Sequence, residues 1–180
     1  MRMKLHNRIV LINGCCLILL VAVAGHVAAG DAVDTGFPSA LEELFGRRLV
    51  DAEGRNISTA ELADKEKIGI YFSAQWCPPC RTFTPHLVEA YHQLKEEGKS
   101  FEVVFVSWDR SSEDMLQYMR DYDMNFLALP HGDQKADELK SRFGVRGIPR
   151  LVIVDSSGKV LSDNARGQVT QLGKDAYDRW

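Results

Sequence analysis

A Cys-x-x-Cys pair separates an apolar run from an amphipathic run, and this junction constrains the fold more than any other stretch. Residues 68–74 are apolar and aromatic-rich, and this short run predicts a buried strand. From Pro79 to about Glu97, apolar side chains recur at helical spacing, namely Phe83, Leu87, Ala90, Tyr91 and Leu94. Cys77 and Cys80 are therefore expected where a strand ends and a helix begins.

This position predicts thiol chemistry. At a helix N-terminus, the unpaired N–H groups and the positive end of the dipole stabilise an anion. Cys77 is the thiol that this field would hold as a thiolate, and the thiolate is the nucleophile. Cys80 follows one turn later, close enough to attack a mixed disulfide formed at Cys77. The pair predicts a redox-active disulfide in which Cys77 is the nucleophile and Cys80 the resolving cysteine.

Three other interpretations of the pair remain open. A structural zinc site needs about four ligands, but no third cysteine follows the N-terminal segment, and His86 and His92 lie six residues apart on one predicted helix. We therefore expect no metal site. A static disulfide across a two-residue spacer would close almost no loop and stabilise little. The motif could also serve packing alone.

Composition and charge limit the possible partners. The chain has 180 residues, 45% apolar and 26% charged, as is ordinary for a single globular domain. Its net charge of −3 provides no basic surface for nucleic acid or an anionic membrane. No nicotinamide, flavin or phosphate-binding motif occurs, so we expect no cofactor. Electrons for a redox reaction would have to come from another protein or a small thiol.

The N-terminal segment has the pattern of a secretory leader. Residues 1–8 carry Arg2, Lys4 and Arg8, an apolar run follows over residues 9–24, and small residues come next. Basic, apolar and then small is the order of a signal peptide. We therefore predict a signal peptide over residues 1–29, or alternatively a membrane anchor, and a secreted or lumenal location. A linker is expected over 30–43 and the folded domain over 44–180.

Asn56 begins the sequence Asn-Ile-Ser, a glycosylation motif that is usable only in a eukaryotic secretory route. The alternative is an unmodified turn. Asn56 is therefore a candidate modification site that depends on the predicted location.

Beyond the Cys-x-x-Cys pair, strands alternate with helices, and this order predicts a three-layer α/β domain with a mixed sheet. Ser111 or Ser112 and Asp133 are candidate helix N-caps. Residues 155–158 have the composition of a hairpin turn. The expected elements are a helical turn at 41–45, a strand pair within 48–56, a short helix from 58, strands at 101–107, 126–129, 151–154 and 159–161, and a helix over 165–180.

A second motif, Gly147-Ile148-Pro149, immediately precedes the apolar strand predicted at 151–154. A proline at a strand start removes a donor from the ladder, so it belongs at an edge or at a functional bend. From sequence alone, the Ile148–Pro149 bond has only the base-rate chance of being cis. By itself the motif is ordinary.

Together these motifs resemble the thioredoxin superfamily. The resemblance is carried by Trp-Cys-Pro-Pro-Cys at 76–80, Pro85 inside the helix and Gly-Ile-Pro at 147–149. Within the superfamily, residues 83–85, 101–107, 111–116 and 146–154 resemble the tryparedoxin/nucleoredoxin branch, and nucleoredoxin-like proteins most. The similarity runs from about residue 44 to residue 180.

The resemblance implies a thioredoxin fold, a cis peptide at Ile148–Pro149 and substrate docking beside that proline. It adds Trp76, Pro78 and Pro79 to the expected docking surface, and makes the substrates protein disulfides or dithiols. Tyr71 occupies the position where thioredoxins place a buried acid, so proton transfer during resolution must use water or another group. Members of this branch are mostly cytosolic, in contrast to the predicted leader.

We therefore predict a thiol-disulfide oxidoreductase of the protein-disulfide reductase type. The alternative from another class is a secreted or membrane-tethered binding or signalling module with an incidental dithiol. A membrane-tethered reductase for protein thiols is a third possibility.

Overall fold

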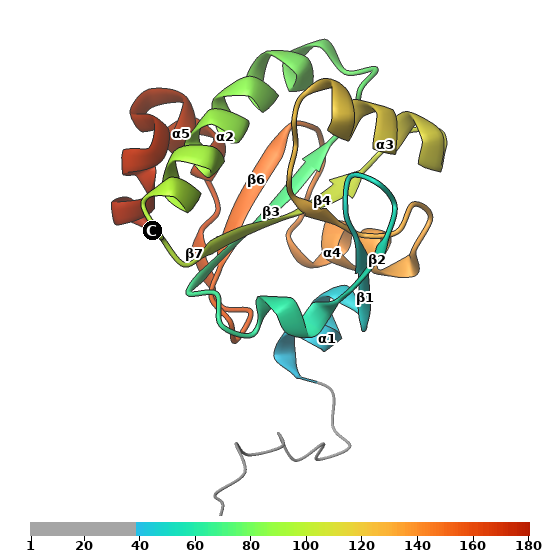
Figure 1. Cartoon of the computed structure of the whole chain (residues 1–180), viewed down its shortest axis with the longest axis horizontal. Helices are drawn as coiled ribbons and strands as arrows, with labels where there is room; N and C mark the ends of the chain where they lie inside the picture. The colour runs from blue at the N-terminus through green and yellow to red at the C-terminus, as the bar shows by residue number, and fades with distance from the viewer. Residues whose placement is uncertain (1–38) are drawn as a thin grey trace, which may run out of the picture. The chain divides into compact units, whose positions relative to one another are not determined.

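In the computed structural model of the protein, residues 39–180 are described, and they form a mixed sheet flanked by helices (Figure 1). The strands are β1 (Arg48–Val50), β2 (Asn56–Ser58), β3 (Lys67–Ser73), β4 (Phe101–Ser107), β5 (Leu127–Ala128), β6 (Arg150–Val154) and β7 (Val160–Ser162). The α-helices are α1 (Ala40–Phe45), α2 (Pro78–Glu96), α3 (Ser112–Asp121), α4 (Gln134–Arg142) and α5 (Ala165–Leu172), and two 3-10 helices are η1 (Thr59–Leu62) and η2 (Gly173–Arg179).

The seven strands of the sheet are arranged in the order β2-β1-β5-β4-β3-β6-β7. β3 pairs in parallel with β4 over its whole length and antiparallel with β6 on its other side. Parallel neighbours end at the same sheet edge, so the segments that follow β3 and β4 lie close together. The predicted fold class, a three-layer domain with a mixed sheet, is confirmed.

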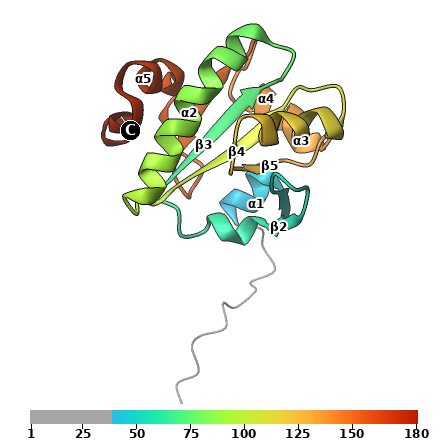
Figure 2. The same cartoon turned by 45° about the horizontal axis from the view of Figure 1, so that its top comes forward.

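One face of the sheet is covered by α2, α3, α5 and η2. Alternate residues of the central strands, among them Tyr71, Val103, Phe105 and Leu151, join the helical side chains in one buried cluster. The apolar spacing read in the sequence is the buried face of α2, because Phe83, Leu87, Tyr91 and Leu94 are nearly inaccessible. Figure 2 shows α2 lying along this face.

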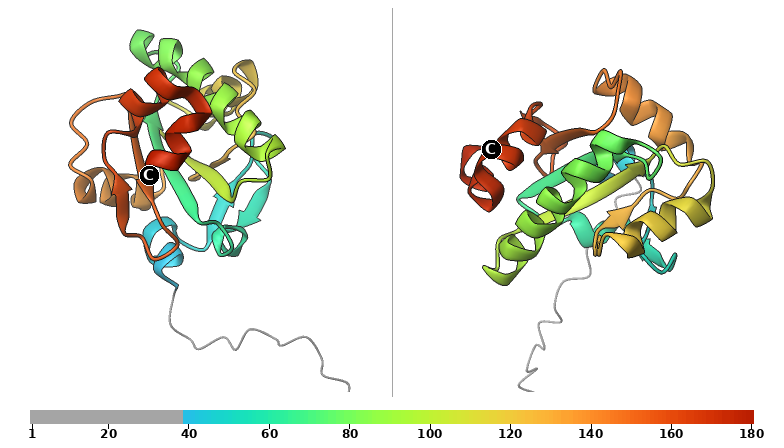
Figure 3. Two further views of the ribbon diagram at one scale, coloured as in Figure 1. Left: turned by 90° about the vertical axis from the view of Figure 1, so that its left-hand side faces the viewer. Right: turned by 90° about the horizontal axis from the view of Figure 1, so that it is seen from above.

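The opposite face packs against α1, η1 and α4. The intervening strand residues, such as Ile70, Phe72, Val104 and Val152, form a second buried cluster. Both faces of β3 and β4 are therefore dry, which explains why these strands are continuous apolar runs rather than alternating ones. Seen from above, α4 lies on the other side of the sheet from α2 and α3 (Figure 3, right).

α1 matches the helical turn expected at 41–45, but it begins at Ala40 and buries Leu41, Leu44 and Phe45, so the expected linker–domain boundary at 43/44 falls inside this helix. Two other elements differ from the expectations. The short helix expected from Ser58 is the 3-10 helix η1, in which Ser58 Oγ accepts from Ala60 N. The expected helix over 165–180 is divided at Gly173, whose positive φ of 55° ends α5 before η2 begins.

No helix among residues 39–180 is both long and apolar enough to cross a membrane. The predicted signal peptide or anchor, residues 1–29, lies outside the described residues.

Candidate redox site

The dithiol sits at the N-terminus of α2, where the chain leaves the carboxyl end of β3. Cys77 is the N-cap of α2, and Pro78 and Pro79 occupy its first two positions. Proline suits these positions because their N–H groups would have no intrahelical partner. Cys77 and Cys80 form a disulfide with their Cα atoms 5.2 Å apart. The predicted disulfide and its place in the fold are therefore present.

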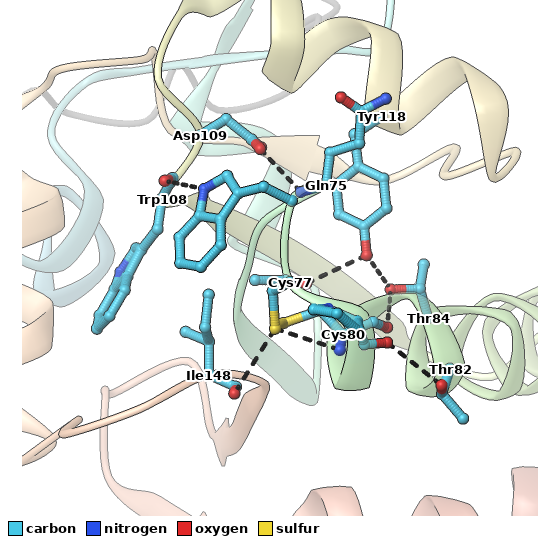
Figure 4. Close-up of a disulfide and its surroundings, with 12 residues drawn as sticks. Gln75, Cys77, Cys80, Thr82, Thr84, Trp108, Asp109, Tyr118 and Ile148 are labelled. Carbon is cyan, nitrogen blue, oxygen red and sulfur yellow. Dashed lines mark hydrogen bonds between the residues drawn. A yellow bond between two sulfur atoms is a disulfide. The ribbon is translucent and has the colours of Figure 1, made fainter.

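The two sulfurs differ in their surroundings (Figure 4). Cys80 is completely buried, whereas the Cys77 residue is 4% exposed. Cys77 Sγ accepts a hydrogen bond from Cys80 N at 3.3 Å and lies 3.8 Å from the carbonyl oxygen of Ile148. The Ile148–Pro149 bond is cis, as the resemblance implied. The folded chain thus brings the two predicted motifs together across 71 residues of sequence.

Trp76 directly precedes Cys77 and has an exposed side chain. It is 52% exposed, the most accessible large hydrophobic residue among those described. Its Nε1–H donates to the carbonyl oxygen of Trp108 at 3.0 Å, just beyond the end of β4. An exposed indole with its polar atom tied down is a rigid apolar contact surface.

Asp109 anchors the active-site loop from the neighbouring β4–α3 connection. Its carboxylate accepts from the backbone N of Gln75 at 2.8 Å and from Ser107 Oγ at 2.8 Å. His131 Nε2 lies 2.9 Å from the carbonyl oxygen of Asp109. Burial raises the pKa of the Asp109 carboxyl above its usual value, with the hydrogen bonds from Ser107 and Gln75 acting in the opposite direction.

A chain of hydroxyl groups lies beneath the dithiol. Thr84 Oγ1 donates to the carbonyl oxygen of Cys80 at 2.9 Å, and Tyr71 OH and Tyr118 OH lie 2.7 and 2.5 Å from Thr84 Oγ1. Because a hydroxyl has one proton, Thr84 accepts from both tyrosines while it donates to Cys80. Tyr118 OH also lies 3.3 Å from Ser73 Oγ.

This network is uncharged at physiological pH. Burial is the main cause that raises the pKa values of Tyr71 and Tyr118 above that of a free tyrosine. Thioredoxins place a buried acid at the position of Tyr71. This protein has a neutral hydroxyl there, hydrogen-bonded to the hydroxyl of Thr84. The position can hold the backbone of Cys80 in place, but it contains no acid that titrates near neutrality.

Sequence reasoning did not identify Thr84, Trp108, Asp109 and Tyr118. A usable signal existed for two of them, because Thr84 and Tyr118 are polar residues at core positions of helical patterns, next to Leu87 and Met119. Asp109 could have been suspected as the first acid after β4, since parallel strands end at one edge. The contact of Tyr118 with Thr84 depends on the packing of α3 against α2, and the contacts of Trp108 and Asp109 depend on the pairing of β3 with β4.

Of the remaining predicted residues, Pro78 and Pro79 adjoin the disulfide in sequence, and Asn56 lies on another strand. Pro78 and Pro79 are exposed at the start of α2, next to Trp76. Asn56 is exposed on the edge strand β2. Among residues 39–180, no three His, Cys, Asp or Glu side chains are grouped so that they could hold a metal ion.

The fold and the site define a thioredoxin-type dithiol protein: a disulfide at a helix N-terminus lies beside the cis Ile148–Pro149 bond that precedes β6 of a mixed sheet. A family model described as thioredoxin-like matches residues 65–160. The chain belongs to this thioredoxin-like family, in its nucleoredoxin and tryparedoxin branch. Nucleoredoxins and tryparedoxins are thioredoxin-type oxidoreductases.

Relatives of both kinds match. Nucleoredoxin from Bos taurus is 36% identical over 180 residues, covering 93% of this chain and 41% of that protein. Tryparedoxin II from C. fasciculata is 39% identical with a TM-score of 0.68, covering 77% of this chain and 92% of that structure. A tryparedoxin II complex with glutathionylspermidine is 38% identical with a TM-score of 0.67, covering 74% and 93%. The chain spans about two fifths of the length of the bovine nucleoredoxin.

These relatives correct the predicted location. The secretory or membrane-anchored location is wrong, because nucleoredoxin homologues are cytosolic or nuclear proteins. The prediction depended on residues 1–29, and a basic start followed by apolar and small residues is a compositional pattern that does not specify export by itself. Glycosylation at Asn56 was expected only in a secretory route, so rejecting the secretory location removes the reason to expect it.

Proposed function

We propose that the protein is a thiol-disulfide oxidoreductase that reduces disulfides of protein or small-thiol partners through Cys77 and Cys80. The observation that carries the proposal is the placement of Cys77 Sγ at the start of α2, within 3.3 Å of Cys80 N. The amide donor and the dipole of a 19-residue helix both favour the thiolate at this sulfur.

In the proposed reaction, the Cys77 thiolate attacks one sulfur of the partner disulfide and forms a mixed disulfide. The partner's other sulfur leaves as a thiolate and takes a proton from water. The Cys80 thiolate then attacks Cys77 Sγ, which closes the Cys77–Cys80 disulfide and releases the second partner thiol. Two electrons pass to the partner, and a donor dithiol or two small-thiol molecules return them to the enzyme.

The order of attack follows from access. Cys80 is buried beneath Cys77, so an incoming disulfide meets Cys77 first. In this proposal the exposed Trp76, Pro78 and Pro79 form one side of the docking surface and the half-buried Ile148 forms the other, with the buried Pro149 fixing the backbone behind it. The carbonyl oxygen of Ile148 lies 3.8 Å from Cys77 Sγ, and we expect it to accept a hydrogen bond from the partner's backbone.

The known ligand of one relative supports the partner class. Tryparedoxin II has been solved in complex with glutathionylspermidine. The proposed electron donor of this chain is of the same general kind, either a small thiol or a donor protein with its own dithiol.

The test is turnover of insulin disulfides with dithiothreitol as the electron source. We expect the wild-type protein to catalyse reduction, Cys77→Ser to abolish it, and Cys80→Ser to trap a mixed disulfide that non-reducing mass spectrometry detects. A wild-type protein with no more activity than Cys77→Ser would contradict the proposal.

The binding module with an incidental dithiol predicts a different pattern. In that case a partner protein captured from an extract would bind Cys77→Ser and wild type equally. Loss of capture in Cys77→Ser together with trapping by Cys80→Ser excludes it.

A further inference from the structure

A groove of about 670 Å³ lies between α2 and the end of α3, on the face of α2 away from α5. Its apolar part is formed by Pro85 and Val88 of α2 and by Tyr122. Figures 1 and 2 show the two helices that flank it. A groove that combines a few apolar side chains with charged ones suits a peptide segment of mixed polarity.

The rim of the groove is acidic. Glu89 and Glu96 line it from α2, and Asp121 and Asp123 line it from the end of α3, with no lysine or arginine among the lining residues. Within residues 39–180, none of these four carboxylates forms an ion pair with a lysine or arginine; Asp123 lies 3.9 Å from His92 Nδ1. Elsewhere acids do form such pairs, as Glu97 does with Lys174 and Glu138 with Lys135.

The groove is connected to the dithiol loop. Gln75 Nε2 donates to Asp121 Oδ2 at 3.5 Å, and Gln75 directly precedes Trp76. This contact joins Asp121, which lines the groove, to the loop that carries the dithiol. It favours, as the occupant, a segment of the molecule whose disulfide Cys77 attacks.

We propose that the groove binds a segment of the protein substrate that carries lysine or arginine side chains around an apolar residue. The proposal rests on the proposed function and adds the class of substrate. The cations lie against the carboxylates of the rim, and the apolar residue packs against Val88 and Tyr122.

The spacing of the acids defines the segment further. Glu89 and Glu96 are seven residues apart on α2, or about 10 Å along the helix axis. An extended peptide covers about 10 Å in three residues. The preferred segment therefore has two basic residues about three positions apart, with the apolar residue between them.

The test separates docking from redox chemistry by using a probe without cysteine. A fluorescein-labelled peptide, Ser-Lys-Leu-Ser-Lys-Ser-Gly, is titrated with the oxidised full-length protein, and a peptide with glutamate in place of both lysines serves as its control. We expect the lysine peptide alone to bind, and its affinity to fall as salt screens the charges.

Matched variants locate the binding. The groove variant combines Glu89→Gln, Glu96→Gln and Asp123→Asn; asparagine tolerates the φ of 53° at position 123. The control variant combines Glu43→Gln, Glu61→Gln and Asp163→Asn, which are exposed and outside the groove. Both raise the net charge equally. We expect about tenfold weaker peptide binding for the groove variant and unchanged binding for the control.

Absence of binding, or an equal loss in both variants, would overturn the proposal, since an equal loss reflects net charge alone. Cystine peptides with lysine or glutamate flanks then separate this failure from that of the proposed function. Reduction of both at the same kcat/KM overturns the groove alone, whereas reduction of neither overturns the oxidoreductase function.

Discussion

The two halves of α2 lie on the same face of the same sheet, but different kinds of interaction hold them there. The N-terminal half, which holds the dithiol, is joined through its own Thr84 to the hydroxyls of Tyr71 on β3 and Tyr118 on α3. The C-terminal half sits on aromatic rings, with Tyr91 packed 4.8 Å from Phe126 and 6.3 Å from Phe101, centroid to centroid. Phe101 in turn contacts the ring of Trp180 at 5.4 Å.

The two kinds of interaction have different effects: the hydrogen bonds fix the geometry of the sulfurs, and the aromatic packing contributes most to the stability of the fold. Hydrogen bonds are directional, so the hydroxyls hold the first turns of α2, and with them the sulfurs, in one geometry. Burial of aromatic rings is less directional but larger in free energy. We therefore expect changes in the aromatic half to act on folding and changes in the hydroxyl half to act also on exchange chemistry.

The largest expected effect is on stability. Phe101→Ala removes a ring that is 1% exposed and in contact with Tyr177 and Trp180. Truncation of such a phenylalanine costs about 3–5 kcal/mol of unfolding free energy, measurable by urea unfolding. The rate of insulin reduction per folded molecule should stay at the wild-type value. If the rate of insulin reduction per folded molecule falls together with stability, the proposed division between the two halves of α2 is wrong.

Thr84→Val should affect both quantities. Valine keeps the shape but leaves Tyr71 OH, Tyr118 OH and the carbonyl oxygen of Cys80 without this partner. The expected loss is about 1–3 kcal/mol, together with slower release of substrate from the Cys77 mixed disulfide in stopped-flow measurements. Thr82→Val is the matched control, because Thr82 is an exposed threonine of the same helix that also bonds a carbonyl, that of Pro78. Equal rates for the two variants would contradict a positional role of Thr84.

Asp109 tests the loop that carries Trp76. Asp109→Ala leaves Gln75 N–H without its acceptor, and such a loss costs about 1–3 kcal/mol. We expect a higher KM for insulin, since the docking surface loses its anchor, while Asp109→Asn keeps an acceptor and should restore most of both values. Failure of asparagine to rescue the KM would show that the charge of Asp109, rather than its hydrogen bond, is required.

The smallest expected effect concerns pH. Because burial raises the pKa of Asp109 above the ordinary value of 3.8, the native state holds this proton more tightly than the unfolded state does. Its contribution to stability therefore decreases as pH rises from the ordinary value through the raised one. Urea unfolding between about pH 4 and pH 7 should show this decline in wild type relative to Asp109→Asn. Parallel curves would contradict it.

The regular elements were predictable where the pattern was long. The strand predicted at 101–107 is β4 with the same bounds, and Ser111 and Asp133 cap α3 and α4 as expected. Short elements were less predictable: η1 is a 3-10 helix, and Gly173 divides the C-terminal helix, because a single backbone conformation decides such segments.

The N-terminal segment shows a different limit. Its basic, apolar and small residues have the order of a signal peptide, but this composition does not determine where the protein is located. The nucleoredoxin relatives decided that question.

The sequence by itself determined the dithiol, its place between a strand and a helix, and the class of chemistry, because adjacent residues set all three. Tertiary structure alone decided what surrounds the sulfurs. The carbonyl of Ile148, the anchor at Asp109 and the hydroxyl of Tyr118 reach the site from distant segments. Their arrival depends on strand order and on the register of β3, β4 and β6, which many residues determine together and no local pattern encodes.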